Sequence, residues 1–91
     1  MRTIKYLKGF KRDYKRTERS SGFNENIFIH TINFLRSDKP LPLSQRDHCL
    51  IGNWKGYREC HIKPDLLLIY RKPDNKTLEL VRIRSHSQLG L

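Results

Sequence analysis

Long apolar runs are missing from this sequence of 91 residues. The apolar run LLLIY (66–70) falls far short of the ~20 residues that a transmembrane helix needs, and it predicts a buried strand. The basic N-terminus lacks the continuous apolar segment of a secretory signal peptide. There are only two cysteines, Cys49 and Cys60. Without a secretion signal, we expect both to be reduced thiols in a cytoplasmic protein.

Acidic residues are also few: nine Asp and Glu stand against 19 Lys and Arg, so the formal net charge is +10. Residues 1–20 contain eight of the basic and two of the acidic residues, and carry +6 of that charge. For any single lysine, a solvated helix face is the simpler interpretation. The surplus as a whole predicts a polyanionic partner: nucleic acid first, and an acidic protein or an anionic membrane second.

The N-terminal half has the pattern of a strand followed by two helices. TIKYL (3–7) mixes β-branched, aromatic and basic residues as a short strand does. Apolar residues then recur at helical spacing, which predicts a basic amphipathic helix over about residues 8–19. Asn24 is suited to cap a second helix. This helix should stop before Pro40, because proline disfavours helical geometry in the residue before it.

The C-terminal half has the pattern of a loop followed by three strands. Residues 41–52 are rich in turn formers and fit neither the helical nor the strand period. Strands are predicted at 53–62, 65–71 and 77–86, with a turn at 72–76. The order β-α-α-β-β-β predicts one α+β domain spanning residues 1–91, with a small antiparallel sheet and two N-terminal helices packed on it.

Two of these strands carry polar side chains at alternate positions, which places the polar groups on one face of each strand. If the two faces coincide, the sheet presents histidines, cations and a tyrosine on one surface. The residues concerned are Lys55, Tyr57 and His61 on strand 53–62, and Arg82, Arg84 and His86 on strand 77–86.

Such a surface has the chemistry of a metal-independent ribonuclease. A general base takes the proton of the RNA 2′-hydroxyl, a general acid protonates the leaving 5′-oxygen, and cations stabilise the charge on phosphorus. Histidine suits both proton roles because its ordinary pKa lies near neutral pH. The predicted catalytic residues are His48, His61, Asp65 and His86; the predicted RNA-binding residues are Lys55, Tyr57, Arg58, Lys63, Arg82 and Arg84.

Simpler roles are open for some of these residues. His48 could anchor its loop through a hydrogen bond, and His61 with Asp65 could be a structural pair. Two Cys–His dipeptides raise the question of zinc, but adjacent strand residues point to opposite faces and no C-x₂₋₄-C knuckle exists, so we predict no metal site. Cys60 has the parity of the apolar positions on its strand and is predicted to lie in the core.

The run DHCLIGNWKGYRECHIKPDLLLIY, followed by LVRIRSHSQL, resembles the YafQ branch of the RelE-like bacterial toxins over about residues 40–89. The resemblance implies the RelE-like fold. It also implies a ribosome-dependent mRNA endoribonuclease that cuts the codon in the aminoacyl site, contacts 16S rRNA and needs no cofactor. A cognate antitoxin would hold it inactive. Carried over by position, the family's catalytic residues fall on His48, His61, Asp65 and His86, and its phosphate-binding arginine falls on Arg82.

The roles within this set are a hypothesis. We expect Asp65, together with His48 or His61, near the 2′-hydroxyl, and His86 near the leaving oxygen. Two other functions fit the charge and the fold: a ParE-like poison of DNA gyrase, and a non-enzymatic RNA- or ribosome-binding protein that uses its first helix on phosphates. Neither needs the set of histidines, so we favour the nuclease.

Overall fold

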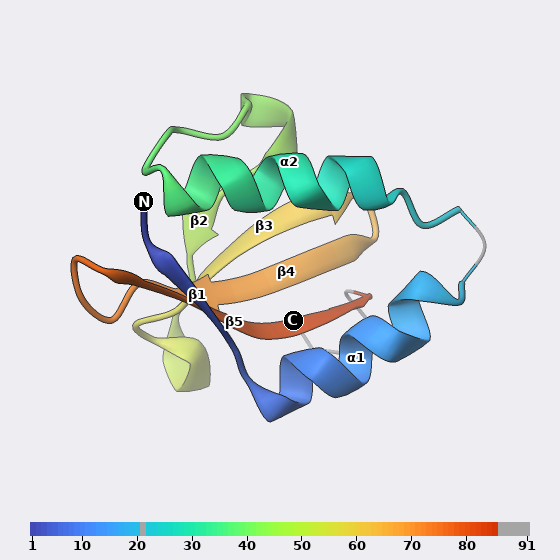
Figure 1. The fold of residues 1–91 in the computed structure, drawn as a ribbon. Coiled ribbons are helices and arrows are strands. Elements are labelled where there is room, and N and C mark those ends of the chain that lie inside the picture. Colours follow the sequence, from blue (N-terminus) through green and yellow to red (C-terminus); the bar gives the residue numbers. More distant parts are fainter. Residues whose placement is uncertain (21, 86–91) are drawn as a thin grey trace.

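The computed structural model describes residues 1–20 and 22–85 of the chain. Its helices pack against a sheet, with α1 running alongside the last strand (Figure 1). Two short 3₁₀ helices, Leu43–Gln45 and Gly52–Trp54, flank the second strand. The main elements in chain order are β1 (Thr3–Tyr6), α1 (Lys8–Glu18), α2 (Glu25–Arg36), β2 (His48–Cys49), β3 (Arg58–Lys63), β4 (Leu66–Arg71) and β5 (Thr77–Ser85).

The five strands form one mixed sheet in the order β1-β5-β4-β3-β2. The predicted α+β fold, with two helices packed on a sheet, is confirmed. The sheet is not wholly antiparallel, because β1 pairs in parallel with β5 while all other neighbours are antiparallel. A parallel pair needs a crossover of a dozen or more residues, and the segment containing α1 and α2 is part of that connection.

The strand predicted at 53–62 begins only at Arg58. The residues before it form the second 3₁₀ helix, which begins at Gly52 with a φ of +66°, and a turn at Gly56 with a φ of +94°. Both values favour glycine. The segment predicted as a loop, 41–52, contains the first 3₁₀ helix and β2, which pairs with β3. This short edge strand carries His48.

The helices begin and end close to their predicted limits. The Asn24 side chain accepts hydrogen bonds from the backbone N–H groups of Asn26 and Ile27, at 3.0 and 3.3 Å, and so caps α2 as predicted. The helix ends at Arg36, before Pro40. No helix in the described residues is long and apolar enough to cross a membrane.

The main core lies between the helices and one face of the sheet. Within it the Phe10 and Phe28 rings bring the two helices together, with centroids 6.0 Å apart. Strand β4 is buried on both faces from Leu67 to Tyr70, as its apolar sequence predicts. Buried core residues include Phe10, Phe28, Ile32, Leu35, Cys60, Ile62, Leu68, Tyr70, Leu78, Leu80 and Ile83.

Candidate active site

The strand register gathers polar side chains on the face of the sheet opposite the helices. Across β3, β4 and β5, Glu59 is level with Ile69 and Arg82, and the next row runs from His61 to Arg84. Their neighbours along each strand belong to the core beneath the helices, so alternation places these rows on the opposite face. The register thus confirms that His61, Arg82 and Arg84 share one surface. We call this surface the site face.

Glu59 joins the two described candidate histidines. Strand pairing sets His48 opposite Glu59, and the Glu59 Oε1 atom lies 3.5 Å from Nε2 of His48 and 3.8 Å from Nε2 of His61. The Glu59 side chain is only 5% exposed. Its Oε2 atom has no hydrogen-bond partner among the described residues. A buried carboxylate oxygen without a donor is costly to stability, which points to a functional role.

Both imidazole rings are oriented by backbone carbonyl groups. Nδ1 of His48 lies 2.6 Å from the Arg46 carbonyl oxygen, and Nδ1 of His61 lies 3.1 Å from that of Pro64. A carbonyl oxygen only accepts, so each Nδ1 carries the hydrogen and donates it. Nε2 of each ring is therefore the nitrogen left for proton exchange, and a proton gained there is directed towards Glu59.

Arg82 is held by a buried aspartate from the first helix. Its Nε and Nη2 atoms donate to the two oxygens of Asp13 at 2.6 and 3.2 Å, and the Ile83 N–H donates to Oδ2 at 3.3 Å. Nε of Arg84 lies 3.7 Å from Oδ1 of Asp13. The hydrogen bonds with Asp13 raise the pKa of the Arg82 guanidinium. At Gly9, a Cβ atom would lie 2.9 Å from Cδ of Arg82, so glycine leaves room for this arginine.

Asp65 lies in the exposed turn between β3 and β4. Together with Lys63, Arg16 and Arg84 it lines a hollow of about 270 Å³. No hydrogen bond or ion pair joins Asp65 to His61 among the described residues, so the structural pairing considered from the sequence is not seen there. Lys63 donates to the Gly22 carbonyl oxygen at 2.9 Å, which ties this turn to the loop after α1.

Comparison with known proteins decides the family. The family model described as "Bacterial toxin of type II toxin-antitoxin system, YafQ" matches residues 2–90. The chain belongs to the YafQ family. It is 36% identical over 89 residues to the mRNA interferase toxin YafQ of Escherichia coli K12, covering 97% of this chain and 95% of that protein.

Solved structures agree with this assignment. A copper-bound mutant toxin from Helicobacter pylori matches with a TM-score of 0.91 and 39% identity, over 98% of this chain and 99% of that one. The E. coli DinJ-YafQ complex matches with a TM-score of 0.84 and 33% identity, over 98% of each chain. The predicted resemblance to YafQ toxins is confirmed.

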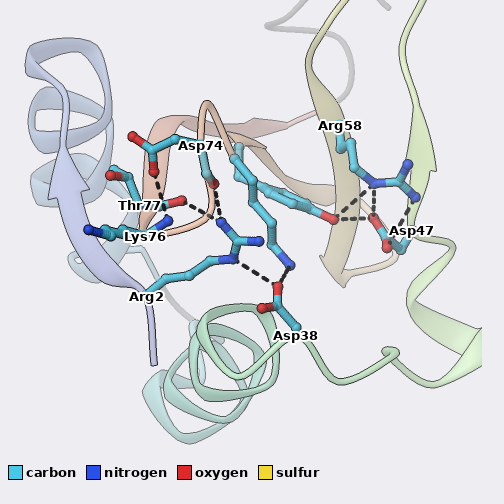
Figure 2. A network of polar contacts seen from close by, with 9 residues as sticks. Arg2, Asp38, Asp47, Arg58, Asp74, Lys76 and Thr77 are labelled. Carbon is cyan, nitrogen blue, oxygen red and sulfur yellow. Dashed lines mark hydrogen bonds and ion pairs between the residues drawn. The ribbon is translucent and has the colours of Figure 1, made fainter.

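Arg58 is separated from the other candidates in this YafQ-family chain. It faces Tyr70 across β3 and β4, on the helix side of the sheet. Its guanidinium contacts Asp47 and the Tyr70 hydroxyl (Figure 2). Burial opposes the charge, but the hydrogen bonds with Asp47 and Tyr70 raise the pKa of Arg58. Arg58, which the sequence predicted to bind RNA, therefore does not share the site face with Arg82 and Arg84, because its side chain points to the other face.

Lys55 and Tyr57 precede β3 rather than lying on it. Lys55 is exposed. The Tyr57 ring centroid lies 5.3 Å from the guanidinium carbon of Arg71, and the ring packs edge-on against Trp54 with centroids 5.5 Å apart. The strand alternation assumed for these two residues is wrong, because the chain turns at Gly56. Tyr57 instead forms a cation–π contact with Arg71.

The remaining candidates are the cysteines and the last histidine. Cys49 and Cys60 are both free. Cys60 is fully buried, as predicted, and burial raises the pKa of its thiol. In residues 1–20 and 22–85, no group of three or more His, Cys, Asp or Glu side chains is arranged to hold a metal ion. His86 lies outside the described residues, immediately after the end of β5.

Sequence reasoning missed two residues of this site, Glu59 and Asp13. Glu59 has the same strand parity as His61, so alternation placed it on the right face but gave it no role. Asp13 lies three residues after Phe10 and four before Thr17, and all three are buried. An aspartate on the apolar side of an amphipathic helix was the available signal for a buried ion pair.

Proposed function

We propose that this chain is an mRNA interferase, an endoribonuclease that cuts mRNA in the aminoacyl site of a translating ribosome. One observation carries the proposal: the Nε2 atoms of His48 and His61 face the same buried oxygen of Glu59, on the sheet face that also holds Arg82. The family supports it, since the E. coli relative is named an mRNA interferase toxin.

The RNA lies across the site face with the scissile phosphate between the histidines and Arg82. His48 or His61, with Asp65 nearby, takes the proton of the 2′-hydroxyl. The 2′-oxygen then bonds to phosphorus as the bond to the 5′-oxygen breaks. A second group, which we assign to His86, gives its proton to that leaving oxygen. The products are a 2′,3′-cyclic phosphate and a 5′-hydroxyl, with no net change in protons.

Two carboxylates act as positioning residues in this scheme. Asp13 accepts hydrogen bonds from Nε and from one N–H group of Nη2 of Arg82. These bonds fix the plane of the guanidinium group and leave its other N–H groups free to bind the phosphate. Glu59 faces both reacting Nε2 atoms and so receives the charge that either ring gains with a proton. These contacts are in place before RNA binds, and so preorganise the site.

We further propose that a cognate antitoxin holds the chain inactive. The E. coli relative is known in a DinJ-YafQ complex. A net charge of +10 calls for an acidic partner segment, and association should slow at high salt because the attraction between opposite charges is screened.

Primer extension on an mRNA in a reconstituted translation system tests the proposal. Wild type should produce cuts inside codons that depend on ribosomes, and His61→Ala should lose at least 100-fold in rate. His30→Ala is the matched control, because this exposed histidine lies on α2 and packs against Phe34. Translation arrest without cuts would favour a non-enzymatic ribosome-binding protein. Neither cuts nor arrest would turn attention to gyrase.

A further inference from the structure

A second cationic feature lies beside the site face, where α1 runs along β5 (Figure 1). Here a hollow of about 140 Å³ is lined by Arg12, Asp13 and Arg16 from the helix and by Arg82 and Arg84 from the strand. Four guanidinium groups against one carboxylate leave it with three net positive charges. We call this space the arginine hollow.

The arrangement of charges in the arginine hollow is uneven. Asp13 engages Arg82 in two hydrogen bonds and approaches Arg84, so it organises the strand side. On the helix side, Arg12 and Arg16 are exposed and form no ion pair with any carboxylate of the described residues. Like charges four residues apart on a helix repel each other and weaken it. An anion bound between these groups would offset that repulsion.

The arginine hollow is continuous with the candidate active site. Arg16 and Arg84 also line the hollow of about 270 Å³ that contains Asp65. Arg84 stands in the same row as His61, separated by β4, and so about 10 Å away at ~4.8 Å per strand spacing. A ligand that reaches from the histidines across the sheet therefore arrives at the arginine hollow.

We propose that the arginine hollow binds a phosphate of the substrate RNA, one that flanks the scissile linkage. Guanidinium groups match phosphate oxygens through paired hydrogen bonds. Arg12, Arg16 and Arg84 make these contacts, while Asp13 holds the strand side in place. The site orients the RNA strand so that its 2′-hydroxyl meets the histidines. This inference rests on the proposed nuclease function and adds a second point of attachment to it.

The test compares Arg12→Gln/Arg16→Gln with Lys11→Gln/Lys15→Gln. Both variants remove two positive charges four residues apart from exposed positions of α1, but the lysines do not line the hollow. Cleavage of ribosome-bound mRNA is measured for each over a range of salt concentrations. The arginine variant should need about tenfold more protein for half-maximal rate. For this variant, the slope of log apparent affinity against log salt concentration should become shallower by about 1.4, at roughly 0.7 per lost contact with single-stranded RNA. The lysine variant should show a clearly smaller change in both quantities.

A modified substrate identifies the phosphate. A series of mRNAs carries one neutral methylphosphonate linkage at each position around the cut codon. At one position the change should slow wild type by the same factor as the arginine substitutions, and should not slow the arginine variant further. Two changes that remove one interaction are expected to be non-additive in this way.

The possible outcomes separate the two proposals. Absence of cuts by wild type would overturn the nuclease itself. Cuts by wild type with equal behaviour of the arginine and lysine variants would overturn only the phosphate site. Normal cleavage by the arginine variant, combined with loss of binding to the antitoxin, would assign the hollow to an acidic side chain of that protein instead.

Discussion

The substitution Glu59→Gln should move activity and stability in opposite directions. Gln keeps the shape of the side chain and removes its charge. The Glu59 carboxylate is buried, one of its oxygens has no donor among the described residues, and the other faces two imidazole nitrogens at 3.5 and 3.8 Å. The folded protein bears the cost of this poorly paired charge.

Removing that charge should stabilise the fold by about 1 kcal/mol, the lower end of the range for an unsatisfied buried group. In a domain of this size 1 kcal/mol corresponds to a rise of about 4–8 °C in Tm. Activity should fall by roughly 10–100-fold, the usual cost of losing a group that orients an active-site ligand or base. The variant therefore exchanges function for stability.

The assay combines thermal unfolding at pH 8, followed by circular dichroism, with single-turnover cleavage of ribosome-bound mRNA. Glu79→Gln is the matched control. Glu79 is also buried, but its Oε1 atom is ion-paired with Arg71 at 2.7 Å, so this variant should lose stability. If Glu59→Gln lowers Tm as Glu79→Gln does, Glu59 is a structural residue and our reasoning is refuted.

Three further predictions concern the ion pairs and the chemistry. Asp13→Asn should cost about 2 kcal/mol of unfolding free energy in urea, because it leaves Arg82 half-buried without its charged partner; an unchanged midpoint would exclude an anchoring role. The pKa of Asp38 is lowered from its ordinary 3.8 to about 2 by hydrogen bonds with Lys72 and Arg2 (Figure 2). Its stabilising contribution is therefore present above about pH 4 and lost as the pH falls towards 2, and Asp38→Asn should flatten this part of a plot of stability against pH. Cleavage should persist in apo-toxin that has been dialysed against EDTA and returned to ribosomes in magnesium buffer, and restoration only by a transition metal would contradict the scheme.

Local periodicity predicted most of the fold. Alternation predicted one face of β3 for His61 and one face of β5 for Arg82 and Arg84, and the strand register shows that these faces coincide. Leu78 and Leu80 have the same sequence parity as Arg82 but lie in the core, because the pairing of β4 with β5 shifts register between Leu80 and Arg82. The cap at Asn24 follows from a single side chain and its two nearest N–H groups. These features depend on short stretches of sequence, and the structure confirms them.

Features that depend on contacts between distant segments could not be predicted from the sequence. The contact of Glu59 with His48 requires β2, a two-residue strand inside a stretch that looked like a loop. The Asp13–Arg82 pair joins residues 69 positions apart. Lys55 and Tyr57 were placed on the site face although β3 starts only at Arg58 and a turn at Gly56 interrupts the alternation before it. Long-range pairing decides the first two of these cases, and a local turn decides the third.

The pairing of the first strand with the last has a consequence for the making of this protein. β1 adjoins only β5 in the sheet, and the arginine that Asp13 holds follows it 69 residues later in the chain. A chain that ends before β5 therefore has neither the β1–β5 pairing nor the ion pair between Asp13 and Arg82. We expect a nascent chain that ends before β5 to lack the proposed nuclease activity. Under the proposed function, cleavage begins only once β5 has been made and has paired with β1.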